Sequence, residues 1–200
     1  MLRKRDMDAI CNATRLARSI MSRQVKKGDT VIDATCGTGQ DTLFLARLVG
    51  QDGRVLAFDI QEKAIKDTTE LLYSQGCLDQ VALFRDNHIN LQSYIKNGVS
   101  AGMFNLGYMP GGDHSIITNP FDTVLAVNRL LEVLQPGGIL TVVSYPGHPG
   151  GEEESAALQA SLKDLPQQRF EVLFTRFINQ VNHPPQFFYI NKLINYQEVY

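Results

Sequence analysis

The stretch Asp33-Ala34-Thr35-Cys36-Gly37-Thr38-Gly39-Gln40-Asp41-Thr42 follows a short apolar run and precedes a helical pattern. A buried strand is expected at 30–34 and a helix at 42–49, so the two glycines occupy a strand-to-helix turn. Gly37 and Gly39 let the backbone pass close to a ligand, which a Cβ would obstruct. The stretch is therefore the candidate ligand loop of an open α/β sheet.

Strand and helix patterns alternate outward from this turn. Strands are expected at 30–34, 55–58, 81–84, 101–104 and 139–144, and helices at 6–25, 42–49, 62–74, 91–95, 121–134 and 155–165. This alternation predicts a parallel sheet with helices on both faces. Two further strand-like runs, at 170–178 and 187–194, are joined without a crossover helix, which favours an antiparallel hairpin. We predict an α/β fold: a Rossmann-like, doubly wound, seven-stranded, mostly parallel sheet with one antiparallel strand near the C-terminus.

The composition is that of an ordinary globular chain. A length of 200 residues favours one domain over 1–200, and 44% hydrophobic with 20% charged residues disfavours disorder and a coiled coil. The net charge of −2 is uneven, because residues 1–27 carry eight Lys or Arg against two Asp, which leaves −8 for the remainder. This basic N-terminal helical arm is either a solvated helix face or a contact for an anionic partner such as nucleic acid.

Three widely spaced cysteines form no CxxC pair, and no histidine has metal-ligand spacing to another, so neither a disulfide framework nor a metal site is indicated. A reducing cytoplasm fits this usage. We expect no export signal and no membrane span, because no window approaches 18 apolar residues.

Two acidic residues suggest which nucleotide the loop takes. Asp59 ends the second predicted strand, twenty residues after Gly39, where a carboxylate can accept hydrogen bonds from both ribose hydroxyls. A dinucleotide loop needs a third glycine where this chain has Thr42, and Asp33 would repel a diphosphate but could hold the cationic amino group of S-adenosylmethionine. The spacing favours S-adenosylmethionine over NAD.

Asn87 and His88 follow the third strand and could reach an adenine, although a helix cap at Asn87 explains that position equally well.

Several longer strings resemble a bacterial family of class I methyltransferases long labelled rRNA methylases. They are 33–35, 37–42, 58–61, 104–113, 145–149 and 177–180, and the likeness covers nearly the whole chain. Members of that family act as tRNA 5-aminomethyl-2-thiouridine methyltransferases. The resemblance therefore implies that S-adenosylmethionine is the methyl donor and that the acceptor is the aminomethyl nitrogen of the wobble uridine of tRNA. It also implies that the donor loops include Gln40, Asp41 and Gln61.

The loops after the fourth, fifth and sixth strands are expected to surround the transferred methyl, because ligands of open α/β sheets meet the carboxyl ends of the strands. Asn105 and Tyr108 lie in a loop similar to the Asn-Pro-Pro-Tyr loop of amino-methylating enzymes, with Leu106-Gly107 in place of both prolines. His148 is the candidate base and Tyr145 its stacking or hydrogen-bonding partner, although a surface-loop histidine without a task is the alternative. Asn179 and Asn182 are expected to contact the substrate. No cysteine lies in these loops, which favours a nitrogen or oxygen acceptor.

Other functions stay open on the sequence. A small-molecule N- or O-methyltransferase fits the same fold, and a non-catalytic nucleotide-binding module fits the donor loop. A tRNA substrate would make Arg15 and Arg18 of the basic arm phosphate contacts. A homodimer would give so small an enzyme more RNA-binding surface, but nothing in the sequence demonstrates one.

Overall fold

A computed structural model describes residues 12–107 and 119–194, so Tyr108, His114 and the first eleven residues lie outside the described part. Seven strands form one sheet in the order β3-β2-β1-β4-β5-β7-β6. Their bounds are Thr30–Asp33 (β1), Arg54–Asp59 (β2), Val81–Arg85 (β3), Val99–Asn105 (β4), Leu134–Ser144 (β5), Phe170–Thr175 (β6) and Gln186–Lys192 (β7). β7 pairs antiparallel with both β5 and β6, and the other pairs are parallel. The predicted fold class, with its one reversed strand, is confirmed.

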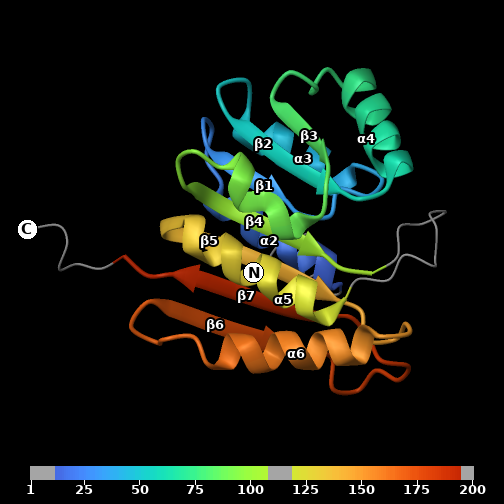
Figure 1. Cartoon of the computed structure of the whole chain (residues 1–200), viewed down its shortest axis with the longest axis vertical. Coiled ribbons are helices and arrows are strands. Elements are labelled where there is room, and N and C mark those ends of the chain that lie inside the picture. The colour runs from blue at the N-terminus through green and yellow to red at the C-terminus, as the bar shows by residue number, and fades with distance from the viewer. Residues whose placement is uncertain (1–11, 108–118, 195–200) are drawn as a thin grey trace, which may run out of the picture.

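Helices cover both faces of the sheet (Figure 1). One face packs against α2 (Ala13–Gln24), α3 (Gln40–Val49) and α4 (Glu62–Ser74), and the other against η2 (His88–Tyr94), α5 (Pro120–Val133) and α6 (Gly151–Lys163). Alternate residues of a strand enter the two cores: Val31 belongs to the first and Ile32 to the second, and neither is exposed. The central strands are thus apolar on both sides, as a doubly covered parallel sheet requires.

Two local expectations were wrong. The segment expected as a helix at 91–95 is a 3-10 helix, η2, that begins earlier, where the Asn87 side chain accepts a hydrogen bond from the Ile89 N–H. Residues 135–138, expected to lie between the helix at 121–134 and the strand at 139–144, are part of β5, because Leu134 pairs with Val99 before the register shifts and Ile139 pairs with Ala101. Pro136 is tolerated in this strand because it stands at the irregularity, outside the regular ladder.

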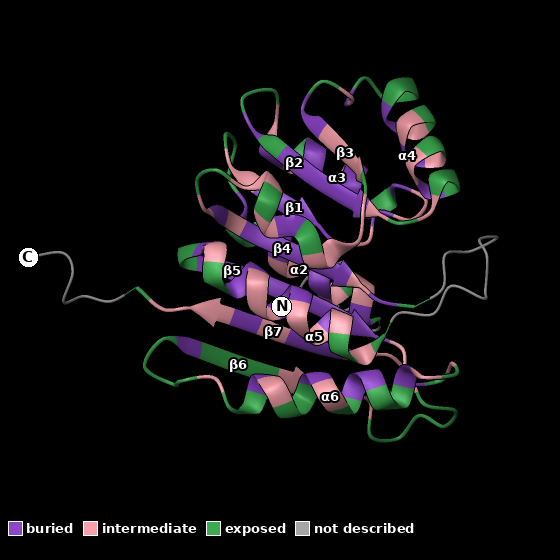
Figure 2. Ribbon diagram, in the orientation of Figure 1, coloured by how far each residue is buried: buried purple, intermediate pink, exposed green. Residues whose placement is uncertain are grey.

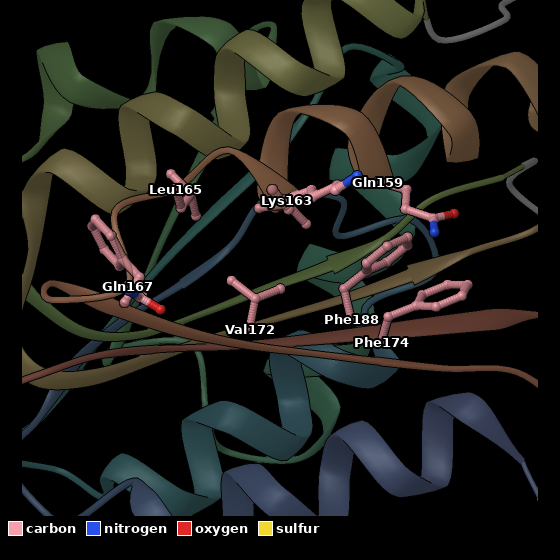
Figure 3. A pocket seen from close by; sticks show the side chains of 9 residues that line it. Gln159, Lys163, Leu165, Gln167, Val172, Phe174 and Phe188 are labelled. Atoms are coloured by element: carbon pink, nitrogen blue, oxygen red, sulfur yellow. The ribbon is translucent and has the colours of Figure 1, made fainter.

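An edge strand and an interior strand of the sheet differ in exposure (Figure 2). β6 is an edge strand with three exposed residues in succession, whereas β5 has seven buried residues in succession from Gly138 to Ser144. A pocket of about 360 Å³ lies between α6 and the outer strands β6 and β7, lined mainly by apolar side chains (Figure 3). None of the predicted site residues lines it. No helix among the described residues could cross a bilayer.

Candidate active site

The strand order reverses between β1 and β4, and the loops that follow these strands define the candidate site. The donor side is the turn between β1 and α3. Asp33 ends β1 and is buried; its carboxylate accepts hydrogen bonds from the Thr42 hydroxyl at 2.6 Å and the Thr35 N–H at 3.2 Å. The Asp33 carboxylate therefore braces the turn from inside.

Burial is the main reason why the pKa of Asp33 is raised, to about 7, and the nearby Asp41 and Asp59 raise it further. The hydrogen bonds from Thr42 and Thr35 oppose that shift because they favour the carboxylate. Burial likewise raises the pKa of the Cys36 thiol, so Cys36 stays protonated in the turn. A cation placed beside Asp33 would favour its charged form.

The two glycines of the turn serve different purposes. Both have left-handed backbone angles, with φ of 51° at Gly37 and 81° at Gly39. A Cβ on Gly39 would lie 2.9 Å from the Thr68 hydroxyl of α4, so this glycine allows helix packing. A Cβ on Gly37 would meet only the Thr35 carbonyl oxygen, at 3.9 Å. Gly37 thus presents open backbone to a ligand, and Thr68 donates a hydrogen bond to its carbonyl.

Asp59 stands at the end of β2 beside this turn. Its carboxylate accepts hydrogen bonds from the Gly37 N–H at 3.0 Å and the Gln61 N–H at 2.9 Å, and it is half-buried. Burial raises the pKa of Asp59, and the backbone N–H groups oppose the shift. The remaining lone pairs of its oxygens are available to a diol, which is the role predicted from the spacing.

The other expected donor contacts flank this centre. Gln40 is exposed at the start of α3, and Gln61 is half-buried just before α4. Asn87 uses its side-chain oxygen as the cap of η2, the structural role that the sequence left open. His88 is half-buried and meets the Phe104 ring edge-on at 5.6 Å; burial lowers its pKa, and a hydrogen bond to the Ala34 carbonyl opposes this. His88 is therefore held next to β1.

The other side of the candidate site, at the ends of β4 and β5, holds a chain of side-chain hydrogen bonds that the sequence did not predict; we call it the acceptor side after the expectation for these loops. Asn105, the last residue of β4, donates from Nδ2 to Asp41 Oδ2 at 3.1 Å and accepts the Tyr145 hydroxyl on Oδ1 at 3.0 Å. Its backbone N–H donates to the Thr35 hydroxyl. Asp41 Oδ1 lies 2.6 Å from Arg18 Nε, and the Thr14 hydroxyl lies 3.2 Å from the Tyr145 hydroxyl. This chain of hydrogen bonds links α2 and α3 to the ends of β4 and β5.

The loops after β4, β5 and β6 come together, as expected. Gly107, with φ of 124°, faces the Tyr145 ring, because a Cβ there would lie 3.2 Å from Tyr145 Cδ2. A Cβ on Gly147 would lie 3.4 Å from the His183 carbonyl oxygen, so the loop after β5 touches the loop after β6. Asn179 and Asn182 are exposed in the latter loop.

His148 lies in the loop after β5 with its ring against the start of α6. Nδ1 is 2.9 Å from the Pro149 carbonyl oxygen; since a carbonyl only accepts, Nδ1 carries the proton and the neutral ring keeps its lone pair on Nε2. Nε2 is buried, and a Cβ on Gly151 would lie 3.0 Å from it. His148 is half-buried beside the acceptor loops, with the basic nitrogen turned toward α6.

Arg15 and Arg18 occupy different surroundings on α2. Arg15 is exposed, whereas Arg18 forms the ion pair with Asp41 and lies over the Phe44 ring, 5.5 Å from its centroid. Asn105, Tyr145, Asp41 and Arg18 are brought into one cluster, and Arg15, Asn179 and Asn182 lie outside it. The sequence analysis did not predict the contacts of Thr14, Thr35 and Thr68 in the candidate site. A single threonine carries no sequence pattern that would identify such a contact.

Known proteins resemble this chain over most of its length. Residues 55–191 match the family model described as "Putative rRNA methylase". A crystal structure described as a "putative rRNA-methylase" from Clostridium thermocellum is 48% identical with a TM-score of 0.89, over 91% of this chain and 98% of that one. A crystal structure of a "putative methyltransferase" from Streptococcus mutans in complex with SAH is 36% identical with a TM-score of 0.83, over the same shares of the two chains.

A curated plant protein is also similar. The chloroplastic tRNA (mnm(5)s(2)U34)-methyltransferase of Arabidopsis thaliana is 41% identical over 164 residues, which cover 77% of this chain and 60% of the plant protein. The chain thus spans less than two thirds of this relative, and a smaller share of the next curated relatives.

Proposed function

The chain belongs to the rRNA methylase family, and from that membership we propose that it transfers a methyl group from S-adenosylmethionine to the aminomethyl nitrogen of 5-aminomethyl-2-thiouridine at the tRNA wobble position. The observation that carries the proposal is the position of Asn105. Its side-chain oxygen lies at the carboxyl end of β4, next to the switch point and beside Tyr145. The names of the plant and Streptococcus relatives support the tRNA substrate and the donor.

The donor half of the site fits S-adenosylmethionine. Gly37 leaves open space where a side chain would otherwise stand, and the Asp59 carboxylate can take the ribose hydroxyls. Asp33 would favour the cationic amino group from within the turn, and His88 would line the adenine side. S-adenosylmethionine supplies a methyl group that is already electrophilic because it is bound to a sulfonium.

The acceptor half has to hold an amine and free its lone pair. Asn105 Oδ1 would accept an N–H of the amine, so that the nitrogen lone pair points away from it and toward the donor side. If the amine titrated like lysine, deprotonation at pH 7 would cost roughly 4.6 kcal/mol, an upper bound because the attached ring lowers the pKa. Correct alignment of nitrogen, methyl carbon and sulfur then accelerates transfer.

We assign the proton-accepting role to His148. In the observed position the Pro149 carbonyl favours the proton on Nδ1, so the lone pair that can accept a proton is on Nε2. Nε2 is turned toward Gly151, so the ring has to rotate out of that position before it can receive the amine proton. Tyr145 would hold Asn105 in place during this step, and Asn179, Asn182 and Arg15 would contact the tRNA.

Mass spectrometry of wobble nucleosides tests the function. The protein is incubated with labelled S-adenosylmethionine and with tRNA that carries the 5-aminomethyl-2-thiouridine precursor. The expected product is the methylaminomethyl nucleoside with one labelled methyl group at position 34. Matched tRNA without the aminomethyl group is the control and should stay unlabelled. Labelling of small amines but not of the precursor tRNA would instead indicate a small-molecule N-methyltransferase.

A further inference from the structure

We infer that Arg18 is a positioning residue for the acceptor amine, acting through Asp41 to fix which atom of the Asn105 amide faces the acceptor. The inference rests on the proposed function and adds a residue to it. It also gives Arg18 a role other than the phosphate contact expected from the basic arm. Three observations carry it: the Arg18 contacts, the hydrogen-bonding capacity of Asp41, and the exposure of Arg15.

Arg18 is held by two residues of α3 on different turns. Its Nε donates to Asp41 Oδ1 at 2.6 Å, and its guanidinium lies over the Phe44 ring. The Arg18 side chain is 35% exposed and that of Asp41 is 7% exposed, so the ion pair is largely withdrawn from solvent on the carboxylate side. Moving Arg18 to a phosphate would leave a buried carboxylate without its cation, which is costly.

The second Asp41 oxygen sets the orientation of the Asn105 amide. Oδ2 lies 3.1 Å from Asn105 Nδ2, and an ionised carboxylate has no proton to donate. The amide must therefore turn its NH₂ toward Asp41 and its oxygen toward Tyr145, whose hydroxyl donates to that oxygen. A flipped amide would place its NH₂ group, a donor, at the position where an oxygen is needed to accept the N–H of the substrate amine.

Arg18 contributes by fixing the Asp41 carboxylate itself. With Oδ1 held by the guanidinium, Oδ2 stays directed at Asn105 at the end of β4. Without Arg18, the carboxylate can rotate and the amide loses the partner that distinguishes its two ends. The reacting nitrogen then loses its fixed hydrogen-bond acceptor. The orientation needed for methyl transfer is then only one of several that the amine can adopt.

Arg15 offers a matched comparison on the same helix, because it is exposed and one turn from Arg18. Arg18→Met keeps an unbranched side chain that can cover Phe44, and it should lower kcat on the precursor tRNA about 10- to 100-fold, the scale of a misplaced reacting group. The dependence of tRNA binding on salt should not change. Arg15→Met should raise the KM for tRNA and reduce the salt slope by about 0.7 to 1.

Two results would overturn the inference. One is an Arg18→Met protein whose defect lies in tRNA KM and salt slope, as for Arg15→Met. The other is a double variant in which the kcat losses of Arg18→Met and Asp41→Asn multiply. We expect them not to multiply, because both substitutions remove the same constraint. Arg18→Lys, which keeps the charge without the Nε donor, should recover only part of kcat.

The side-chain amide of Asn105 gives a readout without tRNA. In ¹⁵N NMR spectra, its NH₂ resonances should move in Arg18→Met and Asp41→Asn and stay in place in Arg15→Met. Unmoved resonances in Arg18→Met, with an unchanged melting temperature, would refute the positioning role. Failure of the unmodified protein to methylate the precursor tRNA would defeat the proposed function instead, and the NMR comparison would still decide what Arg18 does.

Discussion

The Tyr145 hydroxyl lies 3.0 Å from the side-chain oxygen of Asn105, and this hydrogen bond joins the ends of two neighbouring strands, β5 and β4. Tyr145 also faces the Thr14 hydroxyl of α2. The Tyr145 hydroxyl is thus the point at which α2 reaches the acceptor side. It leaves one lone pair of the Asn105 oxygen for a substrate N–H.

Tyr145→Phe should slow methyl transfer without unfolding the protein. The ring stays packed against Gly107. Loss of the neutral hydrogen bond to Asn105, worth about 0.5 to 1.5 kcal/mol, corresponds to a kcat about 2- to 10-fold lower; the contact with Thr14 is lost as well but does not reach the reacting groups. Single-turnover rates at saturating donor and tRNA measure it. Tyr73→Phe is the control, because Tyr73 is 78% exposed on α4. Equal rates in the Tyr145→Phe and unmodified proteins would remove Tyr145 from the reaction.

Asp59→Ala should weaken donor binding. Hydrogen bonds to a charged group contribute about 1.5 to 3 kcal/mol, so the Kd for S-adenosylhomocysteine should rise about 10- to 100-fold by calorimetry. Asp59→Asn keeps one acceptor for the Gly37 N–H and separates loss of the diol contact from collapse of the turn. Asp52→Ala, an exposed acid before β2, should bind normally. Unaltered affinity in both Asp59 variants would place the ribose elsewhere.

The fold was largely predictable because its signals are local. The helix at 62–74 was predicted with its observed bounds, and the missing crossover helix between the last two strand-like runs indicated the reversed strand β7. The start of β5 was missed, because pairing of Leu134 with Val99 overrides the turn preference of Pro136-Gly137-Gly138. A 3-10 helix of seven residues such as η2 is too short for its period to identify it or to fix where it begins.

The site was predictable only in part, since its contacts join distant positions. The spacing of Asp59 after the glycine turn was enough to predict that Asp59 lies beside this turn, because the βαβ unit fixes where the second strand ends. The bonds of Asp41 to Arg18 and Asn105 span 23 and 64 residues, and no periodicity encodes them. The sequence indicated Arg18 only as a phosphate contact of the basic arm, whereas in the fold it is half-buried over Phe44.

The raised pKa of Asp33 predicts how stability varies with pH. The folded-state pKa of about 7 lies above the unfolded value of 3.8, so between these values the folded protein binds more protons and its free energy of unfolding falls as pH rises. From pH 5 to 7 the contribution is about 3 kcal/mol at most. Urea unfolding should therefore show Asp33→Asn gaining stability relative to the unmodified protein over this interval. Parallel pH profiles for the two proteins would contradict this.

His148→Gln should move the pH dependence of turnover to higher pH. Without the imidazole, the acceptor amine has to lose its proton to water, so the rate at neutral pH falls and alkaline pH restores it. Glutamine can still donate to the Pro149 carbonyl, which preserves the loop contact made by Nδ1. Added imidazole should raise the rate of the variant at pH 7. A pH–rate profile identical to that of the unmodified protein would end the case for His148 as the base.

Gly107→Ala should abolish most activity at a modest cost in stability. At φ of 124° an alanine is strained, and its Cβ would lie 3.2 Å from Tyr145 Cδ2, so the ring has to shift and carry its hydroxyl away from Asn105. Gly28→Ala is the matched control: Gly28 has φ of 85°, and a Cβ there has no atom within 4 Å. Both variants should lose about 1 kcal/mol or more of unfolding free energy in urea titrations. Only Gly107→Ala should lower kcat, because only there does the new methyl group press on the acceptor side. Equal activity in the two variants would show that the contact between Gly107 and Tyr145 does not position the reacting groups.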